Sequence, residues 1–258
     1  MEIVNITTDT GAIEGTLVLP PEGVESVAST LLVHGWSSNR NASDVHLAER
    51  LANLGLLSLA IDLPGHGSSS GDRNILLGRD YIEAVKSAYN WLASRMPSTI
   101  RKIIGIGASF GSYLIVRAST ERSFSHLVLR VPANYDDVFD GFPLVDPRLT
   151  GIKAKEWRAH VLPPDSTAAM RALRDFRGEV LVLEAERDEF IPRESVLNLT
   201  RSVNSSHLSH LLIARAPHIM YQNKTSLEAS TTAVCHWLCN SLGIVKSFQS
   251  IESGPSWP

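Results

Sequence analysis

An apolar run that breaks into a serine flanked by glycines is the feature that most constrains the fold of this chain. The segment from Arg101 to Tyr113 reads RKIIGIGASFGSY and passes through Gly107, Ser109 and Gly111 into small and apolar residues. This pattern predicts a strand, a sharp turn that carries Ser109, and a helix. Glycines suit such a turn because they let the backbone pass close to its neighbours. Residues 107–111 also fit an ordinary glycine-rich connection between a strand and a helix, so other parts of the chain must decide between these two interpretations.

Length and charge exclude several classes of protein. A chain of 258 residues fits one α/β domain with a modest insertion, or at most two small domains. No apolar run approaches the roughly 18 residues that a membrane span needs. The formal charge of −3, with both signs scattered, offers no basic stripe for nucleic acid, so a small molecule is the favoured partner. The start of the chain has an acidic Glu2 and no signal-peptide pattern, so we expect a cytoplasmic protein.

Strand-like and helix-like segments alternate along the chain. A hairpin is predicted over residues Ile3 to Leu19, with Gly11 in its turn. Further strands are predicted before Ser109 and at Ser29–Val33, Leu56–Ile61, Ser125–Val131, Glu179–Leu183 and Leu211–Ala214. Helices are predicted at Ser43–Leu54 with Gly55 as its stop, through Tyr81–Leu92, after Ser109, and at Ser226–Leu242. Such alternation favours right-handed crossovers and a mostly parallel sheet covered by helices on both faces.

One interval, from Ala133 to Gly178, interrupts the alternation. It holds four prolines and two short helix-like pieces, which is typical of a functional insertion or lid. Four apolar residues of this interval could lie over a pocket or simply pack the insertion onto the body: Trp157, Met170, Leu173 and Phe176. We therefore expect a core of residues 1–132 and 179–252, a cap of residues 133–178, and a loose tail at residues 253–258.

A nucleophilic serine needs a base and a carboxylate that orients the base. His218 follows the last predicted strand, directly after the stiff Pro217, and is the best candidate base. Asp188 lies beyond the strand that starts at Glu179 and is the candidate acid. Three other carboxylates share that segment and better fit a solvated loop: Glu184, Glu186 and Glu189. The resulting order along the chain is serine, aspartate, histidine.

Two main-chain N–H groups are expected to stabilise an oxyanion beside Ser109. Phe110 directly follows the serine at the start of a helix, and Trp36 follows His34-Gly35 at the end of an earlier strand. His34 itself is expected to brace this loop.

The sequence gives little support for a metal site or a disulfide. Cys235 and Cys239 lie one helical turn apart, which does not suit a disulfide, so two buried free thiols are expected. Together with His236 they could suggest metal binding, but the sequence has no second Cys/His cluster to complete a tetrahedral site, so no metal is assigned.

Together these motifs resemble the α/β-hydrolase superfamily, over almost the whole chain. The glycine-rich turn Asp62–Ser68 and the acid segment Glu186–Pro192 are similar to corresponding loops of that superfamily. The resemblance implies an α/β-hydrolase fold with a short lid insertion, a structural role for His66, and serine-dependent acyl transfer to water without a cofactor. Ala108 stands where a histidine often precedes the nucleophile, and the His34-Gly35-Trp36 loop lacks the HGGG stretch of one lipase and esterase group.

The predicted function is a serine esterase for small or medium acyl groups, similar to feruloyl-type esterases. The opening hairpin is also similar to that of acylaminoacyl-peptidase and dienelactone hydrolase relatives, so a thioesterase, lactonase or peptide amidase with the same triad is an alternative. A second alternative is a non-catalytic small-molecule binding protein on the same fold.

Overall fold

Eight strands form one mixed sheet in the computed structural model, which describes residues 1–96, 100 and 102–244. The strands are β1 (Glu2–Thr8), β2 (Gly11–Val18), β3 (Ala28–Val33), β4 (Leu56–Ile61), β5 (Ile103–Ala108), β6 (Phe124–Arg130), β7 (Glu179–Arg187) and β8 (Leu208–Pro217). Their order across the sheet is β1-β2-β4-β3-β5-β6-β7-β8. Strands β3 to β8 run parallel, and the antiparallel β1–β2 hairpin joins this parallel part through β4. The predicted fold class, an α/β-hydrolase fold, is confirmed.

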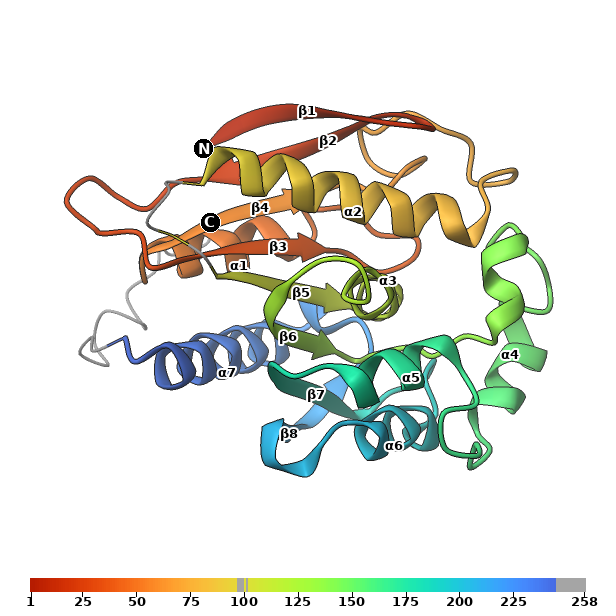
Figure 1. Ribbon diagram of the computed structural model, residues 1–258. Helices are drawn as coiled ribbons and strands as arrows, with labels where there is room; N and C mark the ends of the chain where they lie inside the picture. Colours follow the sequence, from red (N-terminus) through yellow and green to blue (C-terminus); the bar gives the residue numbers. More distant parts are fainter. Residues whose placement is uncertain (97–99, 101, 245–258) are drawn as a thin grey trace.

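Helices cover both faces of the sheet (Figure 1). The α-helices are α1 (Asp44–Ala52), α2 (Gly78–Arg95), α3 (Phe110–Ala118), α4 (Gly151–Arg158), α5 (Ala168–Asp175), α6 (Arg193–Ser202) and α7 (Lys224–Leu242). The described residues also form three short 3₁₀ helices: η1 (Asp137–Gly141), η2 (Ser205–His207) and η3 (Met220–Gln222). Buried side chains of α2, α3, α5 and α6 pack on one face, and those of α1 and α7 pack on the other.

Strands β3, β4, β5 and β6 are largely apolar because both of their faces are buried. In β6, Leu127 and Leu129 belong to the apolar cluster beneath α2 and α3, whereas Val128 belongs to the cluster beneath α1 and α7. Alternate residues of a strand point to opposite faces, so a continuous apolar run is what a doubly covered strand requires.

The predicted ends of several elements need correction; the last strand, for example, runs over Leu208–Pro217 rather than Leu211–Ala214. The first helix ends at Ala52 with Asn53 as its C-cap, two residues before the predicted end at Leu54. Gly55 is still needed, since its φ is +90° and an added Cβ would lie 2.5 Å from the carbonyl oxygen of Glu25. Strand β7 extends to Arg187 rather than ending at Leu183, because it continues to pair with β8 past the apolar run.

These longer strands bring the candidate acid and base to the same edge of the sheet. Asp188 directly follows β7, and His218 directly follows β8. The two strands are adjacent and parallel, so their carboxyl ends meet at one edge, where ligands bind in open α/β sheets.

The interval between β6 and β7 contains η1, α4 and α5. Helix α4 lies beyond the carboxyl ends of the strands (Figure 1). Helix α5 packs into the body instead, with Met170 and Leu173 buried in the core and Phe176 against it. Three of the four apolar residues considered for covering a pocket thus pack the insertion onto the sheet. The division into core and cap at residues 133 and 178 stays a prediction.

Some expectations lie outside the described residues. The predictions outside the described part concern Arg101, residues 245–252 of the expected core, and the expected tail at 253–258. Within the described part, no helix combines the length and apolarity needed to cross a membrane.

Candidate active site

Ser109 occupies a strained turn between β5 and α3. Its φ of 50° and ψ of −110° lie outside the regions that residues with a side chain normally adopt. A conformation of this kind costs roughly 1–3 kcal/mol and persists only where surrounding structure enforces it. The predicted strand, turn and helix are therefore present, and the strain falls on the serine.

Main-chain hydrogen bonds hold Ser109 in this conformation from several directions. Its N–H donates to the carbonyl oxygen of Arg130 at 2.8 Å. Its carbonyl oxygen accepts from the N–H groups of Ser112 at 3.1 Å and Ala133 at 3.3 Å. The serine is thus tied to the end of β6, to its own helix and to the start of the insertion.

The glycines on either side of Ser109 are required by close packing. An added Cβ on Gly107 would lie 2.4 Å from the Cα of Ser112 in the first turn of α3. An added Cβ on Gly111 would lie 2.1 Å from the carbonyl oxygen of Val33. These contacts bring the first turn of α3 against both β5 and the end of β3.

The loop after β3 lies directly against the serine. An added Cβ on Gly35 would lie 3.4 Å from the Cβ of Ser109, which places the Gly35–Trp36 segment beside the nucleophile candidate. The Trp36 ring packs edge-on against the Phe110 ring, with centroids 5.9 Å apart. Phe110 is the first residue of α3, so its N–H has no acceptor within the helix.

His34 braces this loop through both ring nitrogens. Its Nε2 accepts from the N–H of Leu63 at 3.0 Å, so Nδ1 carries the proton and donates to the carbonyl oxygen of Gly35 at 2.7 Å. Burial lowers the pKa of His34, which keeps the ring neutral and suited to one donated and one accepted bond. The expected bracing role agrees with these contacts.

His66 packs behind the same loop. Its Nδ1 lies 2.9 Å from the carbonyl oxygen of Pro64, and its ring meets the Trp36 ring edge-on at 4.9 Å. Burial lowers the pKa of His66 to about 4. These contacts give His66 a packing role beneath the loop.

His218 and Asp188 form the hydrogen-bonded pair that the sequence predicted. The Nδ1 of His218 lies 2.7 Å from the Oδ2 of Asp188. The other carboxylate oxygen, Oδ1, accepts from the N–H groups of Phe190 at 3.0 Å and Ile191 at 2.7 Å. Because a carboxylate only accepts, Nδ1 of His218 carries the proton and Nε2 is the basic nitrogen.

The three competing carboxylates of this segment each have another partner. Glu184 pairs with Arg193 at 2.9 Å and with His210 at 2.9 Å. Glu186 accepts from the N–H of Arg215 at 2.6 Å. Glu189 accepts from the N–H of His218 at 3.1 Å, a contact that helps to hold the histidine loop but leaves the imidazole to Asp188.

Ser109 and His218 line one cavity of about 670 Å³. Residues from several parts of the chain surround it, among them the loop after β3, the ends of β5 and β6, helix α4, the Asp188 loop, and the segment from His218 into α7. Trp36 also lines the cavity, whereas Asp188 lies behind His218 and Phe110 is buried beneath Ser109. The volume is that of a site for a small or medium organic molecule.

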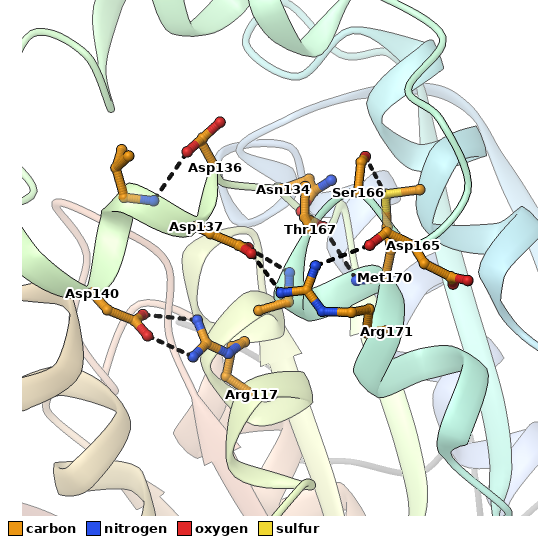
Figure 2. Close-up of polar contacts among 12 residues, drawn as sticks. Arg117, Asn134, Asp136, Asp137, Asp140, Asp165, Ser166, Thr167, Met170 and Arg171 are labelled. Atoms are coloured by element: carbon orange, nitrogen blue, oxygen red, sulfur yellow. Dashed lines mark hydrogen bonds and ion pairs between the residues drawn. The ribbon is translucent and has the colours of Figure 1, made fainter.

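The start of the insertion is fastened to the helix that carries Ser109 at its N-terminus (Figure 2). The guanidinium of Arg117 on α3 makes two hydrogen bonds of 2.8 Å to the carboxylate of Asp140 on η1. Nearby, Asp137 pairs with Arg171 on α5 and accepts from the N–H of Ala168 at 2.6 Å. This network joins η1, α3 and α5.

Several cavity residues are missed by the sequence reasoning. Arg130 at the end of β6 is buried and paired with Asp44 on α1, and the next residue, Val131, has a φ of 43°. Positive φ is a pronounced strain for a β-branched residue. A signal for Arg130 exists, since it is a lone arginine that ends an apolar strand. Lys155 and Arg158 of α4 give no comparable signal, because nothing local shows which way a short helix of an insertion faces.

Both cysteines lie in the last helix of the described part of the chain. Cys235 and Cys239 are buried in α7 and are not joined by a disulfide, and burial raises the pKa of Cys235 to about 12. No group of three or more His, Cys, Asp or Glu side chains among the described residues is arranged to hold a metal ion.

Comparison with known proteins identifies the family. A model of the alpha/beta hydrolase family matches residues 30–223, and the chain belongs to this family. No curated protein matches the sequence.

Solved structures agree with this fold at low sequence identity. Est1E from Butyrivibrio proteoclasticus, with ferulic acid bound, is 17% identical with a TM-score of 0.73, and the match covers 93% of this chain and 99% of that one. The esterase Pf2001 from Pyrococcus furiosus is 22% identical with a TM-score of 0.68, over 94% and 93%. A serine hydrolase without a lid from Xanthomonas campestris is 15% identical with a TM-score of 0.69, over 95% and 96%.

Proposed function

We propose that this protein is a serine esterase that hydrolyses carboxylic esters of small or medium acyl groups. The observation that carries the proposal is the 2.7 Å hydrogen bond between His218 and Asp188 beside a cavity that Ser109 also lines. Membership of the alpha/beta hydrolase family and the fold shared with esterases support it.

In the proposed first step, the Oγ of Ser109 attacks the ester carbonyl carbon while Nε2 of His218 takes the hydroxyl proton. The N–H groups of Trp36 and Phe110 stabilise the oxyanion of the tetrahedral intermediate. Collapse of the intermediate breaks the bond to the alcohol oxygen, which receives the proton from His218. The products of this step are the free alcohol and an acylated Ser109.

In the second step, water attacks the acyl carbon as His218 takes a proton from it. The bond to Ser109 breaks, its Oγ recovers a proton from His218, and the carboxylic acid leaves. Asp188 holds the imidazole in the tautomer and orientation that both steps need, and it stabilises the imidazolium that forms in each.

Labelling with a fluorophosphonate tests the nucleophile. The wild-type protein should be labelled at Ser109, as mapped by peptide mass spectrometry, and should hydrolyse 4-nitrophenyl acetate or butyrate. Ser109→Ala should lose both label and turnover. Ser38→Ala is the matched control: Ser38 also lines the cavity, but it does not stand on the strained turn, so this variant should keep the label at Ser109. A wild-type protein that neither labels nor hydrolyses any activated ester would overturn the proposal.

Matched substrates separate esters from the alternatives. Rates on an ester, a thioester and an amide with the same acyl group should rank the ester first. A faster thioester or amide would keep the triad and change the substrate class.

A further inference from the structure

Helix α4 presents two cationic side chains to the cavity. Lys155 and Arg158 both line it, and they are three residues apart, which places them on the same side of the helix. Lys155 is exposed and donates from Nζ to the carbonyl oxygen of Glu189 at 2.6 Å. Arg158 is buried.

The side chain of Arg158 is held by main-chain carbonyl oxygens. Its Nε donates to the carbonyl oxygen of Asn134 at 2.8 Å, and one terminal nitrogen donates to the carbonyl oxygen of Leu149 at 3.3 Å. Its guanidinium carbon lies 4.5 Å from the centre of the Tyr135 ring. Buried charges are normally paired with an opposite charge, so this arrangement calls for an explanation.

The other arginine that lines the cavity is paired with a carboxylate, as buried charges usually are. Arg130 is equally buried, and it forms an ion pair with Asp44. In the described part of the chain, the ion pairs include neither Arg158 nor Lys155. Glu189 is the acidic residue of the cavity wall, and its carboxylate is engaged by the N–H of His218. The α4 side of the cavity therefore carries more positive than negative charge, although the chain as a whole carries a formal charge of −3.

We propose that Lys155 and Arg158 bind a carboxylate of the substrate, so that the preferred ester carries a second, free carboxylate group. This inference rests on the proposed esterase function. A carboxylate matches the planar N–H donors of a guanidinium, and Lys155 can exchange its main-chain acceptor for the stronger charged one. A half-ester of a dicarboxylic acid or an ester of a carboxylated alcohol belongs to this class.

Two pairs of esters test the inference, one for each side of the scissile bond. 4-Nitrophenyl hydrogen glutarate is compared with the neutral 4-nitrophenyl pentanoate, and 4-acetoxybenzoate is compared with its methyl ester. In at least one pair, the charged ester should have a kcat/KM about tenfold higher or more, because a hydrogen bond to a charged group contributes roughly that factor. The preference should shrink as salt is added, since the mouth of the cavity is open to screening.

Variants of α4 assign the preference to these residues. Lys155→Gln and Arg158→Lys should lower the ratio of charged to neutral kcat/KM, mainly through a higher KM for the charged ester. Lys153→Gln is the matched control because it removes the same charge from the same helix. Lys153 lines a neighbouring, smaller cavity of about 300 Å³, which Arg158 also borders, but it does not line the cavity of Ser109. This variant should keep the wild-type ratio. Lys155 is exposed, so its variant keeps the test valid even where a change at buried Arg158 disturbs folding.

The outcomes separate this inference from the proposed function. Hydrolysis of both members of each pair at similar rates would overturn the carboxylate site and leave the esterase intact. A preference that survives in Lys155→Gln and Arg158→Lys would also overturn it, and would leave Arg158 as a brace between Asn134 and Leu149. Failure to hydrolyse any ester, together with failure to react with fluorophosphonate, would instead overturn the esterase.

Discussion

Gly111 and Val33 lie in backbone contact: a Cβ added to Gly111 would stand 2.1 Å from the carbonyl oxygen of Val33. This contact packs the first turn of α3 against the end of β3, immediately before the His34–Trp36 loop. The candidate nucleophile at 109 and the candidate oxyanion donor at Trp36 come from segments that this glycine holds together.

Replacing Gly111 by alanine should therefore destabilise the protein and reduce ester hydrolysis. Backbone must move to admit the methyl group, at a cost of roughly 1–3 kcal/mol in the free energy of unfolding. Gly141→Ala serves as the control, because an added Cβ there meets no atom within 4 Å, and its effect should stay within about 0.5 kcal/mol. Urea unfolding of both variants measures the difference. Equal stability of the two variants would contradict the packing argument.

Asp188→Asn should lower kcat by a factor on the order of 10³–10⁴ with little change in KM. The amide keeps an oxygen for the N–H groups of Phe190 and Ile191, but it cannot accept the His218 proton as a carboxylate does. Glu186→Gln removes a charge from the same segment, where the side chain accepts from the N–H of Arg215, and should retain nearly full kcat. Steady-state kinetics on a 4-nitrophenyl ester provide the test. A larger loss in Glu186→Gln than in Asp188→Asn would contradict the assignment of the acid.

Acid should destabilise the protein partly through His66. Burial lowers its pKa to about 4, against about 6.5 in the unfolded chain, so the unfolded state binds more protons between these values. The stabilisation from neutral His66 is complete above about pH 6.5 and is lost as the pH falls toward 4. Between pH 7.5 and pH 5, the wild type should lose about 2 kcal/mol more of its free energy of unfolding than His66→Gln does.

Unfolding titrations at several pH values check the His66 prediction. His160→Gln is the control, since His160 is exposed, and it should keep the pH dependence of the wild type. The same acid sensitivity in His66→Gln as in the wild type would assign the effect to other groups.

Cys235 should resist alkylation in the folded protein. Burial raises its pKa to about 12, so at pH 8 its thiolate fraction is lower than in the unfolded chain by a factor on the order of 10³. Iodoacetamide should modify Cys235 in the Cys239→Ala variant rapidly in denaturant and slowly without it, as followed by mass spectrometry. Equal rates under both conditions would show that the thiol is accessible and ionisable in the native state.

Much of the fold can be predicted from local sequence patterns. Apolar runs predicted the parallel strands, and the glycine spacing around Ser109 predicted the strained turn, because both depend on a few neighbouring residues. The placement of Asp188 and His218 after two successive strands predicted their hydrogen bond, since adjacent parallel strands end at one edge of the sheet.

Other features depend on contacts between distant segments. The extension of β7 to Arg187 follows from its pairing with β8, and the packing of Met170 and Leu173 into the core follows from how the insertion folds back. No local pattern shows which side of α4 faces a cavity.

The sequence by itself predicted the α/β architecture and the candidate residues Ser109, Asp188 and His218, because strand ends and turns depend on short-range patterns. Only the tertiary structure decided that Lys155 and Arg158 reach the same cavity as Ser109. Both residues lie more than forty residues after Ser109 in the chain, so their position depends on how the intervening segment folds back toward the site. Hydrophobic periodicity carries no information about that folding.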